Sequence, residues 1–117
     1  MLRLVDETTG DLVASRVSVA ANPWTRFRGL MFRKQLRPGE GLLIRPCGSI
    51  HMMFMRFPID AVFVDANDRV TRVAREVPRW RGLAFGGRGA KAVIELPALA
   101  AANVEPGHQL AFQAVEQ

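Results

Sequence analysis

Three ionisable side chains stand in apolar or turn segments of this sequence, where they could carry out acid-base chemistry. His51 lies in the apolar run 50–57, Asp60 follows a proline-containing bend, and Glu95 lies in the apolar run 92–96. An imidazole with an ordinary pKa of about 6.5 can act as a base near neutral pH, and a carboxylate can orient it. The sequence therefore allows an enzyme, hydrolases included, with His51 as base and Asp60 or Glu95 as the orienting carboxylate, provided that they converge in one pocket.

Each of these residues also has a structural interpretation, which we favour. A histidine in an apolar strand is more often a core residue with satisfied hydrogen bonds. Asp60 more often accepts backbone amides and holds its turn. Glu95 is expected on the same strand face as Val93, where a carboxylate must be paired or neutralised. Either Arg28 or Arg56 is its expected partner.

The sequence gives little support for a covalent nucleophile, a metal or another cofactor. Ser49 and His51 are two residues apart on an expected strand, which does not place one side chain against the other. Cys47 is the single cysteine, and we expect a buried, inert thiol rather than a nucleophile. His51 and His108 are far apart and lack a carboxylate-histidine cluster, so we predict no metal site.

A glycine-rich stretch at residues 78–89 offers a second type of candidate site. Glycine amides can approach an anion closely, Arg88 adds positive charge, and Trp80 could stack on a base or sugar ring. The glycine spacing matches neither a dinucleotide fingerprint nor a nucleotide-triphosphate loop. We favour a mobile connection, with Trp80 as an alternative cap of the core, and keep a set of ligand-binding candidates: Arg28, Arg56, Trp80 and Arg88.

The net charge of +5 comes almost wholly from arginine. Arginine suits phosphate and carboxylate, so a basic nucleic-acid accessory protein is a possible function. The candidates for such contacts are Arg69, Arg72, Arg75, Arg79 and Arg81. A charge of this size is ordinary for a small domain, and we do not favour nucleic acid as a partner.

The elements that would position these residues are mostly strands. Hairpins are expected at residues 2–19 and 61–77, further strands at residues 42–44, 50–57, 91–96 and 109–115, and a loop at residues 78–89. The spacing of apolar residues after Asn22 and Pro23 predicts a helix over residues 23–35, and a proline followed by alanines predicts a short helix over residues 97–104. The predicted fold class is α+β and strand-rich, with one compact antiparallel or mixed sheet. A barrel-like closure of this sheet is one alternative.

The length of 117 residues suits one domain over residues 1–117. No apolar run reaches the length of a membrane span, and the first residues do not form a signal peptide, so we expect a cytoplasmic protein with no membrane partner.

Several short motifs, in order and spacing, resemble the uncharacterised bacterial and archaeal family called domain of unknown function 192. They are Arg28-Gly29-Leu30-Met31, Gly41-Leu42-Leu43, His51 to Met55, Pro58-Ile59-Asp60, Phe63-Val64-Asp65 and Glu95-Leu96-Pro97. The resemblance spans residues 12–112 and implies a compact, strand-rich domain with short helices and no known activity. The family's usual glycine is replaced by Leu99 here, so a close backbone approach to a ligand is not carried over to that position.

The function is therefore unknown from the sequence, and our leading hypothesis is a small domain that binds a small molecule or a protein partner. Its functional cleft would be lined by polar residues of the family-like segments: His51, Arg56, Asp60, Trp80 and Glu95.

Overall fold

The described part of the chain is built from strands. The structure is a computed structural model that describes residues 1–20, 22, 30, 33–51, 55–80 and 83–115, with the backbone alone at residue 51. Its strands are β1 (Leu2–Asp6), β2 (Asp11–Ala20), β3 (Glu40–Ile44), β4 (Ser49–His51), β5 (Ile59–Val64), β6 (Val70–Val77), β7 (Leu83–Phe85), β8 (Ala92–Pro97) and β9 (Leu110–Ala114). Within these ranges no helix is long and apolar enough to cross a membrane.

Seven strands form one mixed sheet in the order β6-β5-β8-β3-β2-β1-β9, and β4 pairs with β7 separately. All neighbours are antiparallel except β2 and β3, which are parallel. Residues 21–39 connect these two strands, and a parallel pair needs a connection of this length because the chain must return to its starting end. The predicted hairpins β1–β2 and β5–β6 are confirmed.

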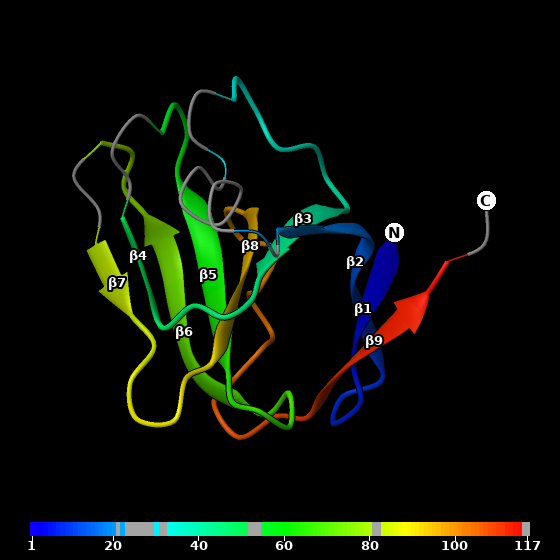
Figure 1. Cartoon of the computed structure of the whole chain (residues 1–117). Coiled ribbons are helices and arrows are strands. Elements are labelled where there is room, and N and C mark those ends of the chain that lie inside the picture. Colours follow the sequence, from blue (N-terminus) through cyan, green and yellow to red (C-terminus); the bar gives the residue numbers. More distant parts are fainter. Residues whose placement is uncertain (21, 23–29, 31–32, 52–54, 81–82, 116–117) are drawn as a thin grey trace.

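The sheet curls until its two edge strands meet at one end (Figure 1). Arg69, just before β6, forms an isolated bridge with Gln109, just before β9. The backbone amide of Val70 donates to the carbonyl of His108 at 2.9 Å, and that of Leu110 donates to the carbonyl of Asp68 at 3.0 Å. The strands therefore form a barrel that is closed where β6 and β9 begin.

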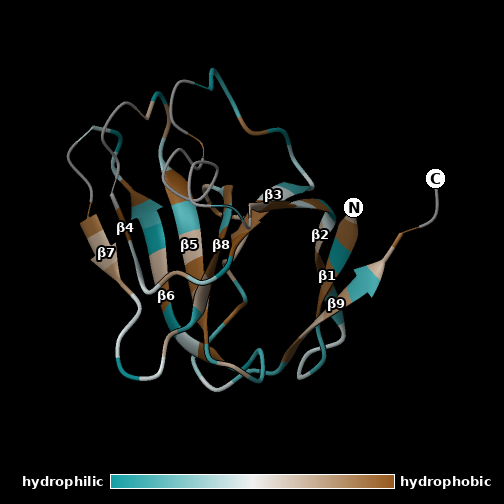
Figure 2. Ribbon diagram, in the orientation of Figure 1, coloured by the Kyte–Doolittle hydropathy of each residue, from teal (hydrophilic) through white to brown (hydrophobic). Residues whose placement is uncertain are grey.

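The neighbouring strands β5 and β8 are buried almost throughout, and apart from Asp60 and Glu95 their residues are apolar (Figure 2). One core cluster fills the concave inner face and takes residues from all seven strands, among them Val62 and Ile94. A second cluster lies on the outer face, where Phe63 and Val93 pack with Ile50 of β4 and Ala84 of β7. Strands buried on both faces read as near-continuous apolar runs, as β5 and β8 do apart from one carboxyl in each.

The prediction of an α+β fold is wrong, because no described residue lies in a helix and the described fold is all-β. The short helix expected over residues 97–104 is a chain of turns, in which Ala100, Ala102 and Val104 each donate to the carbonyl three residues earlier. Leu99 has a φ of +76°, a left-handed conformation that a right-handed helix cannot contain. Of the helix expected over residues 23–35, residues 23–29 and 31–32 lie outside the described residues, and residues 30 and 33–35 are not helical.

Replacing Leu99 with glycine is expected to stabilise the fold by about 0.5–1 kcal/mol, because glycine adopts a positive φ without the steric cost that leucine bears. The leucine side chain is 64% exposed, so little packing is lost. The free energy of unfolding in urea would measure the gain. Ala100→Gly is the control, since Ala100 is exposed and has no positive φ, and it should lose stability. A Leu99→Gly variant less stable than the parent would contradict the strain argument.

Candidate functional site

Glu95 is a buried carboxyl on the outer face of the sheet. It lies in β8 directly opposite Leu42 of β3 and Ala61 of β5. Because side chains alternate along a strand, Glu95 shares its face with Val93, which belongs to the outer core cluster. The Glu95 side chain is only 4% exposed. The sequence therefore predicted its face, and the tertiary structure buries it.

The carboxyl of Glu95 is not paired with any charge in the described part of the chain. Its Oε1 atom is buried and has no hydrogen-bond partner there. Burial removes water from the carboxylate and raises the pKa of Glu95 from 4.5 to about 7. Of the two expected partners, Arg28 lies outside the described residues, and Arg56 is exposed and forms no recorded ion pair with Glu95. Burial therefore favours the protonated form of this carboxyl, and no ion pair within the described residues holds it ionised.

Small side chains continue the row of Glu95 across the sheet. Ala61 lies opposite Glu95 on one side and opposite Ala74 of β6 on the other. Both alanines rise little above the sheet, and residues of the outer cluster, including Leu30 and Met55, pack on this face. Glu95 therefore lies next to the short side chains of Ala61 and Ala74, on the face where the apolar outer cluster packs.

Asp60 lies on the opposite face of the sheet from Glu95. It is opposite Leu96 in the register, and its side chain is fully buried. Its Oδ1 accepts the backbone amide of Glu76 and its Oδ2 accepts that of Ala101, both at 2.9 Å. Asp60 therefore ties β5 to β6 and to the turns that follow β8, and the two candidate carboxyls do not converge on each other.

The other candidate residues are dispersed. The backbone of His51 pairs with that of Leu83, and the His51 side chain lies outside the described part of the structure. Arg56, Trp80 and Arg88 are exposed, and Trp80 has a φ of +68°. Nothing in the described geometry joins these three side chains to Glu95.

Residues 78–89, which were expected to form a loop, contain strand β7. This strand was not predicted from the sequence, because it depends on pairing with the distant strand β4. Gly86, in this segment, has a packing role. A Cβ atom at Gly86 would lie 2.6 Å from Cδ1 of Phe63 and 2.5 Å from Cβ of Ala90. Close packing alone therefore explains the glycine at this position, and a bound phosphate is not needed to explain it.

Three of the five arginines considered for nucleic acid are engaged within the protein. Arg69 donates to the carbonyl of Gly107, Arg72 to that of Phe85, and Arg75 to that of Val104. Arg75 also pairs with Glu105 at 3.0 Å. These guanidinium groups hold neighbouring segments together. Their engagement within the protein disfavours a role in binding the phosphates of a nucleic acid.

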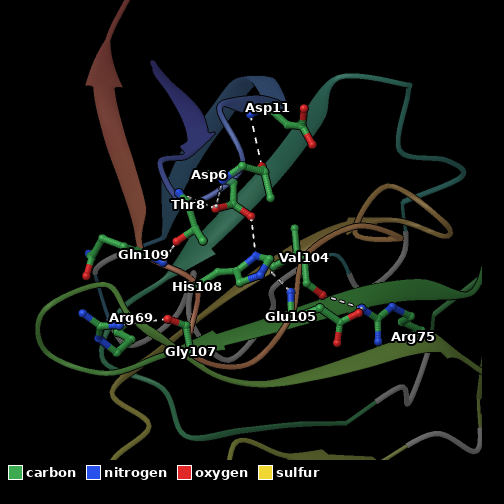
Figure 3. Close-up of polar contacts among 11 residues, drawn as sticks. Asp6, Thr8, Asp11, Arg69, Arg75, Val104, Glu105, Gly107, His108 and Gln109 are labelled. Atoms are coloured by element: carbon green, nitrogen blue, oxygen red, sulfur yellow. Dashed lines mark hydrogen bonds and ion pairs between the residues drawn. The ribbon is translucent and has the colours of Figure 1, made fainter.

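The sequence analysis missed a polar cluster around Asp6 and His108 (Figure 3). The buried Asp6 carboxyl accepts the amides of Thr8 and Thr9 through Oδ1, and its Oδ2 lies 2.8 Å from Nδ1 of His108. The amide of Gln109 donates to the hydroxyl of Thr8 at 2.8 Å. An aspartate two residues before a threonine in a turn is a recognisable signal for the local contacts, but the histidine is 102 residues away. This cluster fastens the β1–β2 turn to the start of β9.

A cavity of about 260 Å³ lies next to that cluster. It is lined by Asp6 and Asp11 at the ends of the β1–β2 turn, by Leu12 and Val13, and by residues of the segment 99–104. Neither Asp60 nor Glu95 lines it. Within the described residues there is also no group of three or more histidine, cysteine, aspartate or glutamate side chains that could hold a metal ion.

A comparison with known families matches residues 4–112 to domain of unknown function 192, described as an uncharacterised ACR. The chain belongs to this family. The resemblance stated from the short motifs is confirmed, and both Asp60 and Glu95 lie in the part of the chain that matches the domain of unknown function 192 model.

Two similar curated proteins and one similar solved structure of this domain of unknown function 192 chain carry names that state no activity. It is 32% identical to a UPF0127 protein of Thermococcus sibiricus, over 97% of this chain and 77% of that protein. It is 34% identical to a UPF0127 protein of Pyrococcus furiosus, over 92% and 95%. A crystal structure of a protein of unknown function from Novosphingobium aromaticivorans has the same fold, with a TM-score of 0.81 and 23% identity over 94% of this chain and 82% of that one. The specific function of the family is not assigned by these relatives.

Proposed function

We propose that this domain binds a small molecule at Glu95, on the outer face of the sheet. The observation that carries the proposal is the buried Oε1 atom, which has no hydrogen-bond partner among the described residues. A buried polar group left unpaired costs about 1–3 kcal/mol, so the carboxyl does not serve stability. A ligand with a hydrogen-bond donor would supply the missing partner.

The surroundings of Glu95 favour a compact ligand that carries one N–H or O–H donor on an apolar body. Its direct neighbours in the sheet, Leu42, Ala61 and Val93, offer only apolar side chains. A carboxyl with a pKa of about 7 is present in both forms at neutral pH, so it can accept a hydrogen bond or donate one. A ligand carboxylate would bring a like charge into the same apolar surroundings and should be excluded.

Four probes with the same alkyl body would test this proposal: butylamine, butanol, butyramide and butyrate. Binding to the native state raises the melting temperature, and a probe at ten times its Kd stabilises by about 1.4 kcal/mol. We expect at least one of the three donors, but not butyrate, to raise the melting temperature of the wild type at pH 7. The shift should disappear in Glu95→Leu.

The matched control is Glu76→Gln, which changes an exposed carboxyl elsewhere on the sheet and should keep the wild-type shift. A shift that persists in Glu95→Leu would place the binding site elsewhere. If none of the donor probes shifts the wild type, binding of this ligand class at Glu95 is refuted.

The pKa of Glu95 also favours a second candidate function, in which the carboxyl transfers a proton during catalysis. A group whose pKa is near the working pH is efficient as a general acid or base. For this candidate, His51 with Glu95 remains the pair to test, since Asp60 uses both oxygens for backbone amides on the other face. Incubating ester and amide analogues of any binding probe with wild type and Glu95→Gln would separate catalysis, which yields product, from binding alone.

A further inference from the structure

The outer edge of β9 has no neighbouring strand along most of its length. The sheet ends at β9. The Arg69–Gln109 bridge and the bond from Leu110 to Asp68 hold only its beginning. Beyond Leu110, none of the described strands pairs with this edge, and Figure 1 shows β9 running outward from the barrel towards the C-terminal end.

The hydrogen-bond ladder shows which backbone groups face this open edge. On the side of β1, Glu7 donates to the carbonyl of Gln109, and Val115 donates to that of Met1. Hydrogen-bonded pairs alternate along antiparallel strands, so the odd-numbered residues of β9 bond to β1. Phe112 and Ala114 therefore turn their N–H and C=O groups outward, on the side where Leu110 bonds to Asp68.

This edge lacks the features with which proteins normally prevent pairing. Residues 111–115 read Ala-Phe-Gln-Ala-Val and contain no charge, proline or glycine. The opposite edge strand, β6, carries Arg72, Arg75 and Glu76, and its pairing with β5 has two register shifts. Charges and bulges protect an edge from another strand. One edge of this sheet is thus protected and the other is open.

We propose that β9 pairs antiparallel with β9 of a second copy of this chain, about a two-fold axis at Gln113. In that register, Phe112 lies opposite Ala114 of the second copy, and Ala114 lies opposite its Phe112. These are the residues with outward backbone groups, and each such pair exchanges both N–H···O bonds. The strand is therefore complementary to itself, which is what a two-fold interface requires.

The side chain at the axis fits a second copy. Gln113 would face Gln113 of the other chain, and an amide can both donate and accept a hydrogen bond. A charged residue at position 113 would lie opposite the same charge in the second copy, which would destabilise the pair. The two chains already repel each other, because each carries a net charge of +5. A five-residue edge is small beside the roughly 1,000 Å² that a stable interface buries, so we expect a weak, reversible dimer.

Sedimentation velocity over a range from about 10 µM to about 1 mM would test the dimer. We expect the average mass of the wild type to rise towards that of two chains. Ala114→Pro should remain monomeric, because proline removes an outward N–H that no β1 residue uses. Gln113→Glu should also remain monomeric, since it opposes like charges while keeping an acceptor for Arg3, which now donates to Gln113 at 2.8 Å.

Ala114→Ser is the matched control, because it keeps the backbone N–H and should dimerise like the wild type. If Ala114→Pro fails to fold, Gln113→Glu still decides the question. A wild type that stays monomeric at the highest concentration would overturn the proposal, and so would a dimer that persists in a folded Gln113→Glu variant.

Discussion

Raising the pH from 4 to 9 is expected to cost the native protein about 3 kcal/mol at Glu95 alone. Burial raises the pKa of this carboxyl from 4.5 to about 7, and each unit of pKa difference is worth about 1.4 kcal/mol. The native state holds this proton more tightly than the unfolded state, so the contribution of Glu95 to stability is fully present below pH 4.5. Stability falls as the pH rises from 4.5 through 7 and then levels off.

Urea denaturation of wild type and Glu95→Gln across this pH range would measure the effect. The glutamine imitates the protonated carboxyl and cannot ionise. The difference between the two profiles therefore isolates Glu95 from the other carboxyls and the two histidines that both proteins share. At pH 9, Glu95→Gln should be more stable than the wild type by about 3 kcal/mol. Parallel profiles would mean that Glu95 is solvated or paired, and the proposed ligand site would lose its basis.

Replacing Asp60 with alanine is expected to destabilise the fold by about 2–6 kcal/mol. The variant leaves the amides of Glu76 and Ala101 without their acceptors, and an unsatisfied buried donor costs about 1–3 kcal/mol. The Asp60 side chain and its bond to Ala101 are buried, so water cannot easily replace the carboxylate there, whereas the bond to Glu76 is only partly buried. The free energy of unfolding in urea is the measurement, and Asp60→Asn, which keeps one acceptor oxygen, should lie between wild type and alanine.

Asp65→Ala is the matched control for this loss. Asp65 also accepts two backbone amides, those of Asn67 and Arg69, but it does so in an exposed turn where water can take its place. It should cost about 1 kcal/mol or less. Equal losses at Asp60 and Asp65 would show that burial does not determine the role of Asp60.

Asp60 and Glu95 lie on opposite faces of one sheet and differ in how their oxygens are bonded. Asp60 on the inner face has both oxygens engaged by backbone amides and holds three segments together. Glu95 on the outer face has a buried oxygen with no partner in the described part of the chain and carries a cost in stability above pH 7. We therefore assign the structural role to Asp60 and propose the ligand-binding role for Glu95.

Local features of the sequence were enough to predict the elements whose contacts are local. Turn residues between two apolar runs identified the β1–β2 and β5–β6 hairpins, because neighbouring strands pair through a short turn. Alternation placed Glu95 on the face of Val93, since side chains of a strand point to opposite faces. The short motifs, in their order, identified the family.

The sequence could not decide what depends on distant segments. The alanine-rich segment 97–104 predicted a helix, but Leu99 adopts a positive φ and the segment instead forms turns that bond to Asp60. Strand β7 exists only because β4 pairs with it, and His108 meets Asp6 only because the sheet curls. Whether Glu95 is paired also depends on the side chains that several strands bring around it. Patterns within a few residues determined the strands, and long-range packing determined how they close and which polar groups they leave buried.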